Sequence, residues 1–158
     1  MEMLIVCTAI ACAAMGGVFL AFSSFVMQGL KALPPAHGIT AMQSINVTAV
    51  TPIFMTALFG TAAACIAVLV SAAIKWHDTV SGYLIAGSLS YLAGAIGVTI
   101  TFNVPLNNAL AAADPSSGDA AWLWMKYVRS WTAWNHVRTV SGLIAAALLM
   151  WTVVKGGV

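Results

Sequence analysis

The residues best equipped for chemistry lie in the segment 131–139, which reads WTAWNHVRT. At about 100° per residue in a helix, one face carries Trp131, Trp134, Asn135 and Arg138, and Gly142 falls on the same face one turn further along. His136 lies on an adjoining face, beside Thr132 and Thr139. Ionisable side chains in a membrane helix are functional candidates by default, while a hydrogen-bonded interior histidine is the plain alternative for His136.

Arg138 is the only charged residue in the apolar stretch 130–154. A charge in such a helix normally faces the bundle interior or water, because exposure to lipid is costly. No Asp or Glu lies in any predicted span, which leaves polar side chains, free backbone carbonyls or an anionic ligand as acceptors. We expect Arg138 to point into the bundle and to contact polar groups of residues 41–48 or 103–108.

Three further segments add polar or aromatic side chains that could line a site. Asn103, Asn107 and Asn108 surround Pro105, and three amides exceed what a helix cap needs. The other two segments are Gln43-x-x-Asn46, followed by Thr48, Thr51 and Pro52, and Phe19-x-x-Phe22-Ser23-x-Phe25. Phenylalanines in a spanning helix usually pack or face lipid, and the alternative is that they line a pocket.

Several chemistries lack the residues they need. The histidines are widely separated, and no Cys–His spacing fits a zinc site, so no metal ligands are predicted. A single axial haem ligand at His136 is an open alternative. His37 and His77 fall in predicted loops and are expected to be structural or solvated. The three cysteines form no CxxC pair, and a net charge of +2 without a basic run argues against nucleic acid.

The elements that must position these residues follow from the distribution of charge. Only 6% of the 158 residues are charged and 61% are hydrophobic, which is too apolar for a soluble fold of this size. The charge-free stretches are each long enough to cross a bilayer. We therefore predict a single all-α transmembrane domain over residues 1–158, with spans at about 3–30, 52–75, 80–102 and 130–154. The predicted fold is an integral membrane four-helix antiparallel bundle in a bacterial inner (plasma) membrane.

Prolines and small residues refine this outline. Pro34 and Pro35 end the first span, and the more polar residues 36–50 are expected to form a short extra helix before the second span. Pro52 either begins or kinks the second span. Gly82, Ala86, Ser90 and Gly94 form a small-residue ridge. Plain helix packing is the preferred interpretation of this ridge, and a homo-oligomer interface is the alternative.

Blocks along most of the chain resemble the anthrone oxygenase-like family of small four-helix membrane proteins. The blocks are FSSFVM (22–27), AMQSIN (41–46), PIFM (52–55), NVPLNNAL (103–110) and WTAWNHVRT (131–139). The resemblance implies oxidation of an activated, anthrone-like aromatic carbon by O₂, with no obligatory metal or organic cofactor. It also implies a hydrophobic aromatic small molecule as substrate, in contact with membrane lipid.

This resemblance assigns roles to the polar and aromatic residues. His136 would be the base that removes the substrate proton. Arg138 and the amides of Asn103, Asn107 and Asn135 would hold the developing oxyanion. The remaining expected contacts to substrate come from Phe22, Phe25, Gln43, Asn46, Asn108, Trp131 and Trp134, of which the aromatic ones could stack a planar ring system.

Two other functions fit the same sequence. One is a non-catalytic membrane module that packs against a partner protein. The other is a module that binds a hydrophobic ligand such as a lipid, a quinone or haem. The polar cluster around Arg138 favours an internal site, so it favours an enzyme or a ligand-binding module over a purely structural subunit.

Overall fold

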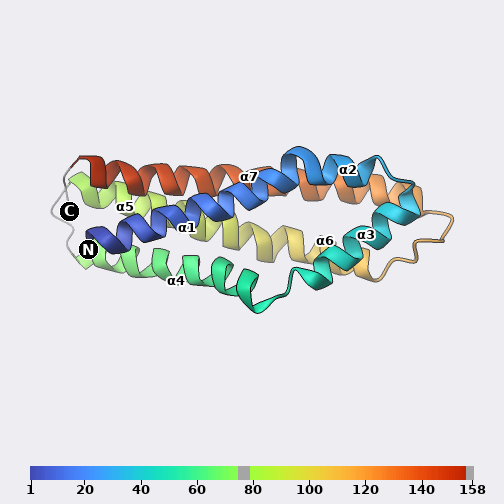
Figure 1. The fold of residues 1–158 in the computed structure, drawn as a ribbon, viewed down its shortest axis with the longest axis horizontal. Helices are drawn as coiled ribbons and strands as arrows, with labels where there is room; N and C mark the ends of the chain where they lie inside the picture. The colour runs from blue at the N-terminus through green and yellow to red at the C-terminus, as the bar shows by residue number, and fades with distance from the viewer. Residues whose placement is uncertain (75–78, 156–158) are drawn as a thin grey trace.

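The computed structural model describes residues 1–74 and 79–155. This part of the chain contains four helices that are long and apolar enough to cross a membrane: Glu2–Lys31, Pro52–Ile74, Val80–Ala111 and Ala120–Val154. They run alternately up and down one long axis, so that the first begins and the last ends at the same end of the bundle (Figure 1). The predicted four-helix antiparallel membrane bundle is confirmed.

The first membrane helix is interrupted by a single π-helical turn. It consists of α1 (Glu2–Ala21), the π turn η1 (Phe22–Val26) and α2 (Met27–Lys31). The short helix α3 (Pro35–Thr48) follows, with Pro34 at its N-cap and Pro35 in its first turn, where a missing N–H costs nothing. This is the extra helix predicted between the first two spans, and it lies at the end of the bundle far from the N-terminus (Figure 1).

Proline begins the second membrane helix and is accommodated within the third. The helix α4 (Pro52–Ile74) begins at Pro52. The third comprises α5 (Thr79–Leu89), the π segments η2 (Ser90–Gly97) and η3 (Thr99–Asn103), and α6 (Val104–Ala111). The sequence predicted its end near residue 102, whereas it continues to Ala111. Pro105 lies in the first turn of α6, two residues after the end of η3, where the hydrogen-bond register changes, so its missing N–H does not stop the helix.

The last helix, α7 (Ala120–Val154), is continuous and sets the depth of the site. A cation–aromatic pair lies at each of its ends. The Nζ atom of Lys126 is 5.0 Å from the Trp122 ring centroid, and that of Lys155 is 5.0 Å from the Trp151 ring centroid. At about 1.5 Å per residue, Trp122 and Trp151 are about 43 Å apart. A bilayer with its headgroups is roughly 40–45 Å thick, so a membrane crossed between these two tryptophans would have Arg138 near its midplane.

Small residues allow α7 to pack closely on its neighbours. A Cβ on Gly142 would lie 3.1 Å from the Cα of Gly16, so α1 and α7 approach there to backbone contact. The Ser90 hydroxyl donates to the Ser141 carbonyl at 3.0 Å, and a Cβ on Gly94 would overlap the Ser141 side chain. Part of the small-residue ridge is therefore used for packing inside the chain.

The buried apolar side chains form two clusters along the bundle. One lies nearer the chain termini and includes Cys12, Leu58 and Tyr91, while the other lies towards α3 and includes Met42 and Trp131. The site described below lies where the two clusters meet. Both of the other histidines were expected in loops. His37 instead lies exposed on the helix α3, and His77 lies outside the described residues.

Candidate functional site

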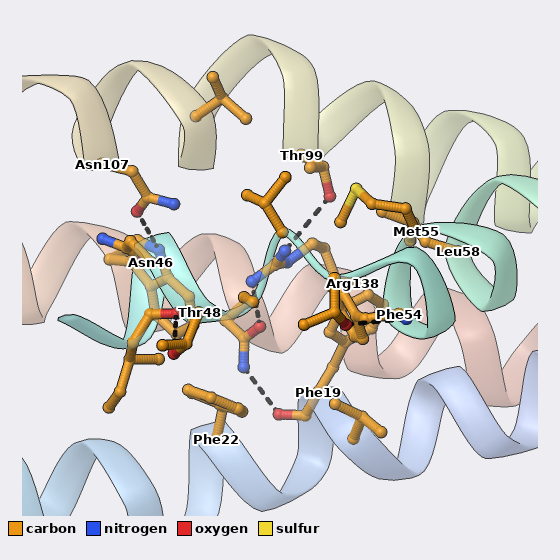
Figure 2. Close-up of a pocket in the computed structure, with 18 of the residues that line it drawn as sticks. Phe19, Phe22, Asn46, Thr48, Phe54, Met55, Leu58, Thr99, Asn107 and Arg138 are labelled. Atoms are coloured by element: carbon orange, nitrogen blue, oxygen red, sulfur yellow. Dashed lines mark hydrogen bonds between the residues drawn. The ribbon is translucent and has the colours of Figure 1, made fainter. Parts of the chain in front are cut away.

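A cavity of about 510 Å³ opens where α1, α3, α4, the third helix and α7 meet. Its walls are mostly apolar, and they surround the side chain of Arg138 (Figure 2). The apolar walls come from Val18, Phe19, Phe22, Met42, Ile45, Ala49, Val50, Phe54, Met55, Leu58, Phe59, Val104 and Trp131. The polar lining residues are Asn46, Thr48, Thr51, Thr99, Asn107, Asn135 and Arg138. The cavity therefore suits a largely apolar ligand with one polar or charged group.

Arg138 is the charged residue of this lining. It is only 7% exposed, so the prediction that it faces the bundle interior is confirmed. One guanidinium nitrogen donates to the Thr99 hydroxyl at 3.2 Å, and another donates to the side-chain carbonyl of Asn135. The hydrogen-bond partners of Arg138 were expected in segments 41–48 or 103–108 but lie outside both. One partner is on α7 itself, and η3 turns the other, Thr99, toward α7. The guanidinium also packs against an aromatic ring, with its central carbon 4.4 Å from the Phe19 ring centroid.

The guanidinium keeps binding capacity that the protein does not use. Its Nε–H is buried and has no hydrogen-bond partner in the described part of the chain. Among residues 1–74 and 79–155, no carboxylate forms an ion pair with Arg138. A buried cation without a counter-ion is costly unless something pairs with it. The site is therefore electrostatically complementary to an anion that enters the cavity.

Asn135 holds Arg138 in place and links α7 to α1. Its amide nitrogen donates to the backbone carbonyl of Phe19 at 2.7 Å and to the hydroxyl of Ser23 at 2.6 Å. Its oxygen accepts from Arg138. These bonds fall at the junction of α1 and η1, where the π turn changes the hydrogen-bond pattern of the backbone. Both ends of the Asn135 amide are therefore engaged in contacts within the protein, which hold Arg138 in place.

Two further amides present N–H groups at the cavity. The Asn107 oxygen accepts from the Tyr127 hydroxyl at 2.9 Å and from Trp131 Nε1 at 2.8 Å. Because an indole nitrogen only donates, these bonds fix the amide orientation and leave its NH₂ unengaged by them. The Asn46 amide nitrogen is buried near the Tyr127 side chain but completes no hydrogen bond with a described residue. The polar part of the cavity thus offers donors, which again favours an anionic or carbonyl oxygen.

The structure brings six of the residues predicted from sequence to this cavity: Phe22, Asn46, Asn107, Trp131, Asn135 and Arg138. Asn103 lies next to it, buried behind the wall. Its amide nitrogen donates to the Trp131 carbonyl at 3.3 Å, and its oxygen has no partner. Asn103 therefore supports Trp131 from behind and does not line the cavity.

Three predicted site residues lie on the outside of the bundle. His136 is exposed and does not line the cavity, since two residues along α7 rotate it roughly 200° away from Arg138. Phe25 is 65% exposed, because η1 turns it away from the bundle. Asn108 is exposed on α6.

Two others have structural contacts away from the cavity. The amide nitrogen of Gln43 donates to the carbonyls of Leu110 at 2.8 Å and Ala113 at 3.1 Å. Gln43 therefore links α3 to the C-terminal end of α6 through these hydrogen bonds. The ring of Trp134 stacks on Phe102 with centroids 3.6 Å apart.

Several cavity residues were absent from the residues predicted to form the site. Thr99 is the most important, because it binds Arg138 directly. Its position four residues before Asn103 and eight before Asn107 was the sequence signal that could have identified it. Phe54 and Met55 follow Pro52 at the start of α4, and both line the cavity. The apolar residues Met42 and Leu58 carry no comparable signal in a chain this hydrophobic.

Comparison with sequence-family models identifies a family for this chain. A sequence-family model described as anthrone oxygenase matches residues 53–148, which extend from the start of α4 through most of α7. This range includes Thr99, Asn107, Asn135 and Arg138. No curated protein and no solved structure matches the chain.

Proposed function

The chain belongs to the anthrone oxygenase family, and from that premise we propose that it oxidises an activated aromatic carbon with O₂ inside the membrane. The substrate is an apolar, anthrone-like polycycle whose methylene group becomes acidic beside a ring carbonyl. O₂ is the co-substrate, with no obligatory metal. The product is the corresponding quinone.

One observation carries this proposal: the cavity is apolar and contains a buried, unpaired guanidinium. Anthrone-like substrates lose a methylene proton to give an enolate, whose charge lies largely on the ring oxygen. Arg138 would pair with that oxygen through its free Nε–H, and Asn46 and Asn107 offer further N–H groups. Preorganised donors in a water-poor site stabilise developing charge strongly, because they need no reorganisation during the reaction.

The reaction balances without another reductant or oxidant. Loss of the methylene proton gives the enolate, which is electron-rich and delivers electrons to O₂. A C–O bond forms to give a hydroperoxide after protonation, and its O–O bond then breaks as the second C–H proton leaves. Overall, R₂CH₂ and O₂ give R₂C=O and H₂O. The carbon is oxidised by four electrons, which reduce one O₂ to the carbonyl oxygen and one water.

The cavity walls contribute positioning and the exclusion of water. Phe22 and Trp131 lie with ring centroids 5.8 Å apart and are tilted against each other, beside the Phe19 ring. A planar polycycle can pack on these faces with its oxygen directed at Arg138. Such an arrangement holds the reacting carbon at a fixed distance from the charged group.

For the first proton we propose a different route from the one expected from sequence. The role of His136 as the base remains a prediction, and its exposed position outside the cavity favours another route. A nearby cation lowers the pKa of a bound acid, so pairing with Arg138 would favour the ionised substrate. We propose that the proton leaves through water at the cavity mouth.

The test is O₂ uptake by the purified protein in detergent with a hydroxyanthrone, together with formation of the quinone. Arg138→Met should lower turnover by about 10²-fold or more, as expected for loss of an oxyanion-stabilising donor. Arg129→Met is the matched control, because Arg129 is exposed on the same helix, and its turnover should match the wild type. Near-normal turnover by Arg138→Met would contradict the proposal.

A module that only binds a hydrophobic anion is the second candidate function. It is favoured by the cavity lining, which contains no carboxylate or imidazole to act as a base among the residues that the structure describes. This candidate predicts Arg138-dependent binding of the hydroxyanthrone without O₂ uptake or quinone. The same assay therefore separates the enzyme from the binding module.

A further inference from the structure

The outward face of α7 is apolar except at one position. Between Arg129 and Trp151, its exposed residues are Ala133, His136, Val137, Val140, Leu143, Ile144, Ala147 and Met150. His136 is the polar member of this set. It makes no contact with the cavity, so its presence on this face is not explained by the proposed reaction.

The depth of His136 makes this exposure costly. The cation–aromatic pairs at Trp122 and Trp151 would place His136 near the bilayer midplane, about 15 Å from the edge of the hydrocarbon on either side. Lipid headgroups and bulk water lie beyond that edge. A neutral imidazole carries one donor and one acceptor, and hydrocarbon satisfies neither.

Three other exposed polar side chains have a hydrogen bond within their own helix. The hydroxyls of Ser24, Thr40 and Thr48 each donate to the backbone carbonyl four residues earlier. No such bond to His136 is found among the described residues. A neighbouring molecule is the remaining source of a hydrogen-bonding partner at this depth.

We propose that this face of α7 is the interface of a homodimer, with His136 of each copy hydrogen-bonded to His136 of the other. Two copies inserted in the same orientation and related by a two-fold axis along the membrane normal place the same residue at the same depth. The donor of one imidazole then meets the acceptor of the other. Ala133, one turn before His136, and Val140, one turn after it, are small enough to let the helices approach.

The test uses cysteine cross-linking of the full-length chain in native membranes. The background carries Cys7→Ser, because Cys7 is exposed, whereas Cys12 and Cys65 are buried. Val140→Cys places a thiol one turn from His136 on the same face. Ile66→Cys is the control, since Ile66 is 50% exposed on the outward face of α4.

The dimer predicts oxidative cross-linking at Val140→Cys at least fivefold above Ile66→Cys. Adding His136→Leu should abolish that excess, whereas His136→Gln, whose amide still offers both N–H donors and a carbonyl acceptor, should retain most of it. A melting curve for each variant separates loss of the dimer from loss of the fold. Leucine at position 136 would face lipid and should leave the melting temperature unchanged, so weaker cross-linking at an unchanged melting temperature reports loss of the dimer. Equal cross-linking at the two cysteines, or cross-linking unaffected by His136→Leu, would overturn the proposal.

Discussion

The guanidinium of Arg138 donates to the side-chain carbonyl of Asn135, one turn earlier on α7. Asn135 in turn donates to the Phe19 carbonyl and the Ser23 hydroxyl of the first membrane helix. The position of the buried cation therefore depends on the packing of α7 against the π turn of that helix. Neutrality of Asn135 matters as much as its hydrogen bonds, because a carboxylate at this position would pair with Arg138 and cancel its charge.

This relationship predicts that Asn135→Asp weakens the binding of an anionic aromatic ligand. The new carboxylate would take the place of the ligand's oxygen as partner of Arg138. A charge-assisted hydrogen bond contributes about 1.5–3 kcal/mol, so affinity should fall by roughly 10–100-fold. The measurement is the Kd of a hydroxyanthrone analogue that does not react with O₂, in detergent.

Asn108→Asp is the control for this change, since it adds the same charge at an exposed residue outside the cavity. Its Kd should stay within about twofold of the wild type. Equal affinities for Asn135→Asp and the wild type would show that the ligand does not pair with Arg138.

A second prediction concerns the close approach of α1 and α7. In Gly142→Ala, the new methyl group would lie 3.1 Å from the Cα of Gly16, a backbone atom that cannot move aside alone. The helices must separate, which should cost about 1–3 kcal/mol and lower the melting temperature. Gly17→Ala is the control, because its Cβ meets no atom within 4 Å and alanine favours a helix. A Gly142→Ala protein as stable as Gly17→Ala would contradict the close packing.

The sequence was sufficient to predict the membrane bundle, for a physical reason. Charges are so costly in lipid that charge-free stretches directly mark the spans. The role of Pro105 was harder to predict. Proline normally ends a helix, but η3 places the break in hydrogen bonding just ahead of it. Such π turns depend on packing between helices, and no local sequence pattern specifies them.

Part of the candidate site was hard to predict for the same reason, because it depends on π turns and on packing between distant segments. Arg138, Asn135 and Trp131 were identifiable because α7 is a regular helix and the cost of burying a charge fixes its inward face. Phe25 was expected beside Phe22, but η1 changes the rotation per residue and turns it outward. The contacts of Gln43 involve Leu110 and Ala113, far along the chain, and no pattern near Gln43 indicates them.

The exposed position of His136 leads to a third prediction. His136→Ala should keep turnover within about tenfold of the wild type, because its side chain does not line the cavity. A positioned general base contributes on the order of 10²–10⁴-fold, so the two possibilities are well separated. The assay is O₂ uptake with a hydroxyanthrone at saturating substrate. A loss of 10²-fold or more, with an unchanged melting temperature, would establish His136 as the base.

The central claim is that Arg138 stabilises the ionised form of the bound substrate, and an optical titration under anaerobic conditions tests it most directly. The neutral and ionised forms of a hydroxyanthrone absorb at different wavelengths, so the spectrum reports the charge of the bound ligand. In the wild type and in Arg129→Met, the ligand should ionise at a lower pH than it does in detergent micelles alone, because a nearby cation lowers the pKa of an acid. In Arg138→Met this shift should disappear. A bound ligand that titrates at the same pH in the wild type and in Arg138→Met would contradict the account.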